Sequence, residues 1–109
     1  MQSATALDRT FQALSDSTRR SMIRALASGQ ARSAGELGKQ FQSAQPTISR
    51  HLKVLESARL IERTVQGRVH RFRLRQKPLQ EAGAWIERHQ RFWTGAADQL
   101  ELLLKGDAT

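Results

Sequence analysis

The sequence predicts a mainly α-helical domain that carries one small β-hairpin and ends in a long helix. Three observations support this fold class. Apolar residues recur at helical spacing over most of the chain, two β-prone runs flank a Gln-Gly-Arg turn, and a broad apolar stripe follows Pro78. A chain of 109 residues matches the size served by one hydrophobic core, so residues 1–109 are expected to form a single domain.

The first two predicted helices are short. The apolar stripe of the first consists of Leu7, Phe11 and Leu14. The pattern restarts in SDSTRRSMIRAL, where Ser15 or Asp16 can accept hydrogen bonds from the free N–H groups at the start of a second helix. The buried side of that helix consists of Met22, Ile23 and Leu26. Gly29 is expected to end it.

A third and a fourth helix follow in close succession. Ser33 and Glu36 have the spacing of a capping box, in which each side chain accepts the other residue's backbone N–H. Pro46 fits only the first turn of a helix, so Ser43 or Ala44 is the expected cap. The inward stripes are Leu37 and Phe41, then Ile48, Leu52 and Leu55. Two brief helices with a tight connection predict a helix-turn-helix.

The remaining elements are a two-stranded hairpin and the final helix. LIERTV and VHRFRL predict strands, and Gly67 between them can adopt the positive φ of a tight turn. One face of the second strand carries His70, Phe72 and Leu74, and the other carries Val69, Arg71, Arg73 and Arg75. A helix is expected over residues 79–104. Its apolar stripe is Leu79, Ala82, Trp85, Ile86, His89, Phe92, Trp93, Ala96, Leu100, Leu103 and Leu104.

The positive charge is concentrated in one segment. The net charge is +8, and residues 45–77 hold nine Lys or Arg against two Glu, which leaves only +1 for the other 76 residues. Such a segment is expected of a surface that contacts a polyanion, because neutralised phosphates release counterions. A solvated basic face is the alternative interpretation.

The outward face of the fourth helix suits DNA. Gln can pair with adenine, Arg with guanine, and the Thr methyl can touch a thymine methyl, whereas Lys53 suits phosphate. An Arg at the hairpin tip can reach a minor groove or its flanking phosphates. The predicted DNA contacts are Gln45, Pro46, Thr47, Ser49, Arg50, Lys53, Arg68, Arg71 and Arg73. His51 falls beside the core stripe, so a packed, hydrogen-bonded histidine is expected there rather than a ligand.

Several classes of function are disfavoured by what the sequence lacks. The chain has no Cys, which excludes disulfides, Cys-type zinc sites and thiol catalysis. Neither a nucleophile elbow nor a phosphate-binding Gly loop occurs, so no enzyme and no cofactor are expected. His51, His70 and His89 do not form a metal motif. No signal sequence or membrane span is recognisable, which predicts a soluble, cytoplasmic protein without a membrane partner.

Two stretches resemble the ArsR family of winged helix-turn-helix repressors. FQALSDSTRRSMIRAL resembles the family's N-terminal segment, and QPTISRHLKVLESARLIERTVQGRVHRFRL resembles its recognition helix and wing. The resemblance implies base contacts by Gln45, Ser49 and Arg50 and a wing-tip contact by Arg68. It also implies a DNA-reading part over about residues 33–75, with repression relieved by an effector.

The resemblance also implies a homodimer formed by residues 5–15 and 79–104. The apolar stripe of the last helix is too broad for one small domain to cover, which favours the same pairing across a two-fold axis. The candidate interface residues are Leu7, Phe11, Leu14, Trp85, Phe92, Trp93 and Leu100. A dimer would place two recognition helices about one DNA turn apart, roughly 34 Å. A small-molecule pocket lined by the Trp and Phe stripe is the alternative.

The sequence departs from the family pattern at several positions. Ser33 and Gly35 stand where arsenic-sensing members have Cys, and the last helix lacks the Asp and His spacing of zinc sensors, so no metal site is expected. The chain therefore resembles a subgroup with a Trp-rich last helix and no recognised metal site, and any small-molecule inducer is unidentified. Ser17 replaces a common Pro. Arg59 replaces a common Gly, at a cost of roughly 1 kcal/mol in the left-handed conformation, so that turn is expected to be reshaped.

The predicted function is that of a homodimeric repressor of its own operon, bound to an inverted repeat in duplex DNA. A winged-helix module that binds RNA or a protein partner is the alternative, since a fold does not dictate its ligand. The outward Gln45, Ser49 and Arg50 favour duplex DNA, because side chains cannot read the deep groove of RNA.

Overall fold

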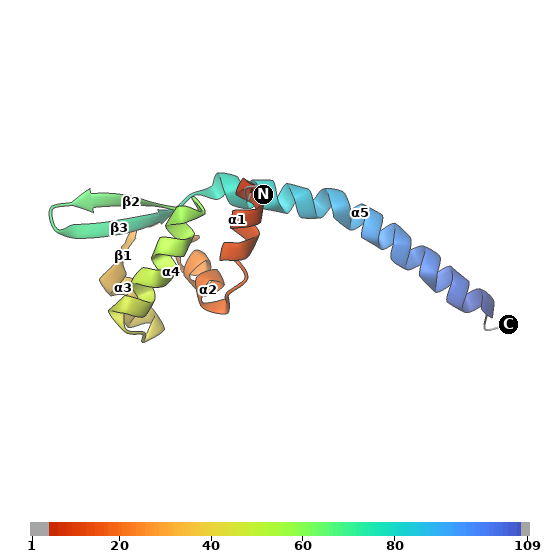
Figure 1. Cartoon of the computed structure of the whole chain (residues 1–109), viewed down its shortest axis with the longest axis horizontal. Helices are drawn as coiled ribbons and strands as arrows, with labels where there is room; N and C mark the ends of the chain where they lie inside the picture. The colour runs from red at the N-terminus through yellow and green to blue at the C-terminus, as the bar shows by residue number, and fades with distance from the viewer. Residues whose placement is uncertain (1–4, 108–109) are drawn as a thin grey trace.

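The computed structural model describes residues 5–107, except for the side chains of residues 91–93, 97 and 105–107. Its elements are α1 (Ala6–Ala13), α2 (Ser17–Leu26), β1 (Arg32–Ser33), α3 (Ala34–Phe41), α4 (Gln45–Ser57), β2 (Ile61–Gln66), β3 (Val69–Leu74) and α5 (Gln76–Asp107). α5 projects from the rest of the molecule, with the β2–β3 hairpin at the opposite end (Figure 1). The predicted fold class, mainly helical with a hairpin and a long final helix, is confirmed.

α3 and α4 form the predicted helix-turn-helix. The capping box is present, because Ser33 Oγ accepts the N–H of Glu36 at 3.1 Å and Glu36 Oε1 accepts the N–H of Ser33 at 3.4 Å. α3 ends at Phe41, and the next residue, Gln42, caps it in a left-handed conformation with φ 51°. α4 begins after Ala44, and Pro46 lies in its first turn as predicted.

The turn from α4 to β2 keeps the left-handed conformation usual after a helix, although the presence of Arg59 predicted that this turn would be reshaped. Arg59 itself adopts the left-handed conformation, with φ 60°. The N–H of Leu60 donates to Leu55 O at 3.0 Å and the N–H of Arg59 to Glu56 O at 2.9 Å, the hydrogen-bond pattern usual after a glycine-terminated helix. Arg75 Nη1 donates to Arg59 O at 3.3 Å. These bonds offset the strain, so the expected reshaping is wrong.

The sheet has three strands rather than the two of the predicted wing. Its order is β1-β3-β2, and both pairings are antiparallel. β1 pairs Arg32 with Phe72 and Ser33 with Arg71, which attaches the start of α3 to the hairpin. The β2–β3 turn contains Gly67 with φ 62°, as its predicted role requires.

One core joins the short helices to the sheet. Its buried members are Ala13, Met22, Leu26, Leu37, Ile48, Leu52, Leu55, Ala58, Leu60, Ile61 and Phe72. Ile23 and Phe41 are partly buried against it. The predicted inward stripes of the second, third and fourth helices are therefore confirmed, and α4 is anchored along the side opposite Ser49 and Arg50.

α5 starts at Gln76, three residues before the predicted start. Pro78 is therefore inside its first turn, where a missing N–H costs no helical hydrogen bond. α1 lies across the beginning of α5 (Figure 1). The rings of Phe11 and Trp85 meet edge to face with centroids 5.7 Å apart, and Trp85 stacks on His89 at 4.2 Å. The prediction placed the contact of α1 with this stripe across a two-fold axis, whereas the structure forms it within one chain.

The apolar stripe of α5 continues beyond α1 without a cover. Ala82, near the start of α5, is buried, but Leu100, Leu103 and Leu104 are 58%, 68% and 62% exposed. The side chains of Phe92 and Trp93, both predicted interface residues, lie outside the described part. Within residues 5–107, no helix has the length and apolar character required to cross a bilayer.

Candidate nucleic-acid interface

α4 divides into a buried side and a polar outward side. Ile48, Leu52 and Leu55 are at most 2% exposed and fix the orientation of the helix. The residues predicted to contact DNA are all exposed: Gln45, Pro46, Thr47, Ser49, Arg50 and Lys53. The predicted separation of the two faces therefore agrees with the structure.

Gln45 differs from its neighbours because its side chain folds back onto α3. Its amide Nε2 donates to Ala34 O at 3.4 Å. The same nitrogen lies so close to Gly38 that a Cβ at this glycine would collide with it. The absence of a side chain at Gly38 thus provides the space for Gln45, and base contact by Gln45 would require the amide to leave α3.

Two of the clustered arginines are neutralised within the chain. Arg63 forms two hydrogen bonds to the Glu56 carboxylate, at 2.9 and 3.1 Å, and its guanidinium lies 5.1 Å from the centre of the Phe72 ring. Arg71 Nη1 donates to Glu36 Oε1 at 3.1 Å. Arg71, predicted to contact DNA, is half-buried, and its bond to Glu36 ties β3 to α3.

The remaining predicted cations stay exposed. Arg50 and Lys53 on α4, Arg68 at the hairpin turn and Arg73 on β3 form no ion pair within the part of the chain that the structure describes. A cleft of about 460 Å³ separates α4 from the hairpin. Its lining includes Ser33, Ser49, Arg63, Arg68, His70 and Phe72. The structure thus brings Ser49 and Arg68 to opposite walls of one cleft.

The TRR triplet of the sequence fastens α2 to the end of α1, a role that sequence reasoning missed. Arg19 Nε donates to Ala13 O at 2.6 Å and its Nη2 to Gln12 O at 3.3 Å, while Arg20 Nη1 donates to Leu14 O at 2.7 Å. Carbonyls in the last turn of a helix have no partner within it. The two arginines donate to these carbonyls, and Ser15 Oγ also donates to Gln12 O at 2.6 Å, so these bonds tie α2 to the end of α1.

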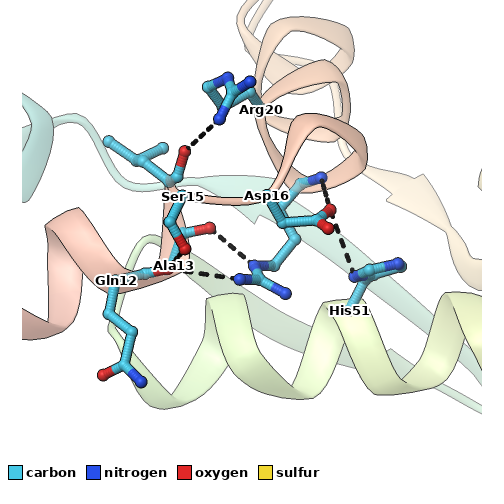
Figure 2. A network of polar contacts seen from close by, with 8 residues as sticks. Gln12, Ala13, Ser15, Asp16, Arg20 and His51 are labelled. Atoms are coloured by element: carbon cyan, nitrogen blue, oxygen red, sulfur yellow. Dashed lines mark hydrogen bonds and ion pairs between the residues drawn. The ribbon is translucent and has the colours of Figure 1, made fainter.

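Asp16 connects this linker to α4. Its Oδ2 accepts the N–H of Arg19 at 3.0 Å and caps α2, which selects Asp16 from the two predicted caps. His51 Nδ1 lies 3.8 Å from the same oxygen (Figure 2). This nitrogen is buried and has no hydrogen-bond partner in the described structure. The predicted packing of His51 beside the core is confirmed, but the predicted hydrogen bond is not formed.

Two capping carboxylates make the fold sensitive to acid. The backbone N–H of Arg19 lowers the pKa of Asp16 from its ordinary 3.8, and the backbone N–H of Ser33 lowers the pKa of Glu36 from 4.5. A carboxyl whose folded pKa is depressed stabilises the fold fully above its unfolded pKa. That contribution is lost as the pH falls through the folded pKa, so unfolding should become easier below about pH 4.5.

Replacing Glu36 by Gln is expected to flatten this acid dependence. The amide still completes a capping box but does not titrate over this range. Urea unfolding midpoints measured between about pH 5 and pH 3 should change less for Glu36→Gln than for the wild type. Glu62→Gln, the same substitution at an exposed position of β2, is the control. An unchanged slope in Glu36→Gln would contradict the role of Glu36.

Metal ligands do not come together in the described residues. No group of three or more His, Asp or Glu side chains there could hold an ion. Glu81, His89 and Asp98 remain separate positions along α5, and His89 Nδ1 contacts Trp85 O at 2.8 Å. The absence of a metal site in the whole protein stays a prediction.

The helix-turn-helix, the exposed cations of α4 and the hairpin beside them define a nucleic-acid-binding class of protein. A family model described as a helix-turn-helix domain matches residues 14–64. The transcriptional repressor SdpR of Bacillus subtilis (strain 168) is 31% identical over 80 residues, which are 73% of this chain and 88% of SdpR. The HTH-type transcriptional regulator Rv2034 of Mycobacterium tuberculosis (strain ATCC 25618 / H37Rv) is 46% identical over 54 residues, half of this chain and half of that relative's length.

A solved structure described as an ArsR family transcriptional regulator has the same fold. The superposition has a TM-score of 0.75 at 33% sequence identity, and it covers 85% of this chain and 95% of the solved chain. The chain therefore belongs to the ArsR family of winged helix-turn-helix transcriptional regulators. The relatives are transcriptional regulators, not enzymes.

Proposed function

We propose that the protein is a homodimeric repressor that binds an inverted repeat in the promoter of its own operon. The observation that carries this proposal is the division of α4, whose apolar side is buried while Ser49, Arg50 and Lys53 are exposed. A helix with this division can enter the major groove without disturbing the core behind it. Repression, rather than activation, is supported by the similarity to SdpR.

Arg50 is the proposed base-reading residue, and the wing supplies phosphate contacts. The Arg50 side chain is long enough to donate two hydrogen bonds to guanine, and Ser49 lies beside it. Arg68, at the turn of the hairpin, would hold the flanking backbone while the DNA strand crosses the cleft between α4 and the wing. Arg63 and Arg71 contribute less, because Glu56 and Glu36 already neutralise them.

The uncovered part of α5 supports the dimer. Leu100, Leu103 and Leu104 lie on one side of the helix and expose apolar surface that pairing with a second copy would bury. A two-fold pair presents two α4 helices to successive major grooves, about 34 Å apart. The two-fold symmetry of the pair is the reason for an inverted repeat as the operator, and the distance sets the spacing of its half-sites.

Fluorescence anisotropy with labelled duplexes tests the proposal. The duplex from the protein's own upstream region should bind more tightly than a scrambled duplex by a factor on the order of 1,000 or more. The affinity should fall steeply as the salt concentration rises, because bound phosphates release counterions. Equal affinity for both duplexes, or tighter binding of single-stranded RNA, would contradict operator binding.

Arg50→Ala is expected to weaken operator binding by about 1 to 3 kcal/mol and to relax the preference at one base pair. Arg68→Ala should weaken all duplexes to a similar extent, since a wing-tip contact to phosphate carries little sequence choice. Binding measured against single-base operator variants separates these two patterns. Arg24→Ala, which removes an exposed cation of α2, is the control. An unaltered base preference in Arg50→Ala would contradict the assignment of Arg50 as the base-reading residue of α4.

A further inference from the structure

A second hollow lies on the opposite flank of α4 from the wing. It has a volume of about 450 Å³ and opens between the end of α1, the start of α2 and α4. From α4 it is lined by Arg50, Lys53, Val54 and Ser57, which share one side of the helix. Its volume falls within the range of about 300 to 1,000 Å³ that is usual for small-molecule sites.

The lining of this hollow combines cations with an apolar floor. Ala13 and Ala58, at 1% and 8% exposure, and the half-buried Val54 provide the floor. The charged members of the lining are all basic: Arg9, Arg19, Arg50 and Lys53. A surface of this kind is complementary to an anion that also carries an apolar group.

One wall of the hollow is preorganised. Arg19 is held in place by the carbonyls of Ala13 and Gln12, at 2.6 and 3.3 Å. These bonds use two of the five N–H donors of a guanidinium. A ligand therefore meets a cation whose side chain is already ordered, which lowers the entropic cost of binding.

We infer that this hollow binds a small organic anion, a carboxylate attached to a compact apolar body such as an aromatic ring. The carboxylate would pair with the basic rim, and the ring would cover Ala13, Val54 and Ala58. A bare phosphate, whether free or in a DNA backbone, would leave that apolar floor exposed to water. The combination of floor and rim therefore favours the organic anion.

Occupancy of the hollow would release the protein from DNA, a consequence that rests on the proposed function. Arg50 and Lys53 line the hollow and also belong to the proposed DNA-reading face. An anion that engages them neutralises two charges that the operator needs and draws Arg50 away from its base. Coupling between two ligands typically changes affinity by a factor of about 5 to 150. We expect a loss of operator affinity of about tenfold or more.

1-Naphthoate serves as the probe, and amide chemical shifts of the isotope-labelled protein serve as the readout. Saturable shifts are expected at Ala13, Val54 and Ala58 in the absence of DNA. Neutral 1-naphthalenemethanol and inorganic phosphate should each bind at least about tenfold more weakly than naphthoate. The alcohol has no charge to pair with the basic rim, and phosphate has no apolar group to cover the floor. Phosphate binding as tight as naphthoate binding would overturn the assignment to an organic anion.

A rim variant separates specific binding from general attraction to a basic protein. Gln12→Glu introduces a negative charge at an exposed position of the lining and should weaken naphthoate binding several-fold. Gln80→Glu, the same substitution on α5 outside the hollow, is the matched control and should leave binding unchanged. Equal affinities in the two variants, or shifts elsewhere on the chain only, would overturn the site.

The DNA arm of the experiment distinguishes the two proposals. Saturating naphthoate should lower operator affinity for the wild type, and Gln12→Glu should require correspondingly more naphthoate for the same effect. Naphthoate binding with no effect on operator affinity would overturn the competition and leave DNA binding intact. Naphthoate binding by a protein that binds no duplex would instead overturn the proposed function while supporting the site.

Discussion

Replacing both Leu100 and Leu103 with Glu is expected to separate the dimer into monomers and to reduce operator affinity by more than about 100-fold. Burying an exposed Leu side chain contributes about 1.5 to 3 kcal/mol, and two-fold symmetry doubles the effect of each substitution. The charged side chains would have to be desolvated in the interface without a partner. Without the dimer, the two half-sites of the operator would bind separate chains.

Sedimentation equilibrium and anisotropy on the same samples measure both effects. Leu102→Glu is the matched control, because Leu102 is 69% exposed but lies on the other side of α5 from Leu100 and Leu103. It should remain dimeric. If the double variant stayed dimeric with unchanged operator affinity, the exposed stripe of α5 would not be the interface.

Leu55→Ala is expected to lower the free energy of unfolding by about 2 to 5 kcal/mol. Leu55 is fully buried and anchors the last turns of α4 to the core. Its carbonyl also accepts the N–H of Leu60 in the turn to β2. Because a domain of this size is stable by only about 5 to 15 kcal/mol, the variant should lose a large fraction of its stability.

Urea unfolding at one fixed protein concentration provides the measurement, since dimerisation makes stability depend on concentration. Lys53→Ala, on the exposed side of the same helix, is the control and should change stability by less than about 0.5 kcal/mol. A loss below about 1 kcal/mol for Leu55→Ala would mean that α4 is held by other contacts.

The sequence predicted the helices well where local signals agreed. α3 and α4 form where the sequence predicted them. The signals were the Ser33–Glu36 capping box, Pro46 in a first turn and the apolar stripe of Ile48, Leu52 and Leu55. A similar signal was overlooked at the start of α1, where Thr5 and Asp8 form a second capping box. Such local features are readable because their partners lie within one turn of each other.

Features that depend on distant partners could not be predicted. β1 has two residues, too few for any alternation to be visible, and it exists only because Arg32 and Ser33 meet β3. The neutralisation of Arg71 by Glu36, 35 residues away, depends on the same pairing. Local periodicity likewise does not indicate whether Phe11 packs on α5 of its own chain or of a second copy.

The basic outward face of α4 was readable from sequence, but the second hollow beside it was not. Helical periodicity places Arg50 and Lys53 on the exposed side. Arg19 and Gln12 line the hollow because the Arg19 side chain donates to the carbonyls of Ala13 and Gln12 and so joins α2 to α1. Helix periodicity gives no signal for such hydrogen bonds from a side chain to backbone carbonyls.

Hydroxyl-radical footprinting on the promoter of the protein's own gene tests the central claim most directly. A dimer that presents two α4 helices to one face of the duplex should protect two tracts related by the symmetry of an inverted repeat, with centres about 10 to 10.5 base pairs apart. A single protected tract, or protection without two-fold symmetry, would contradict it.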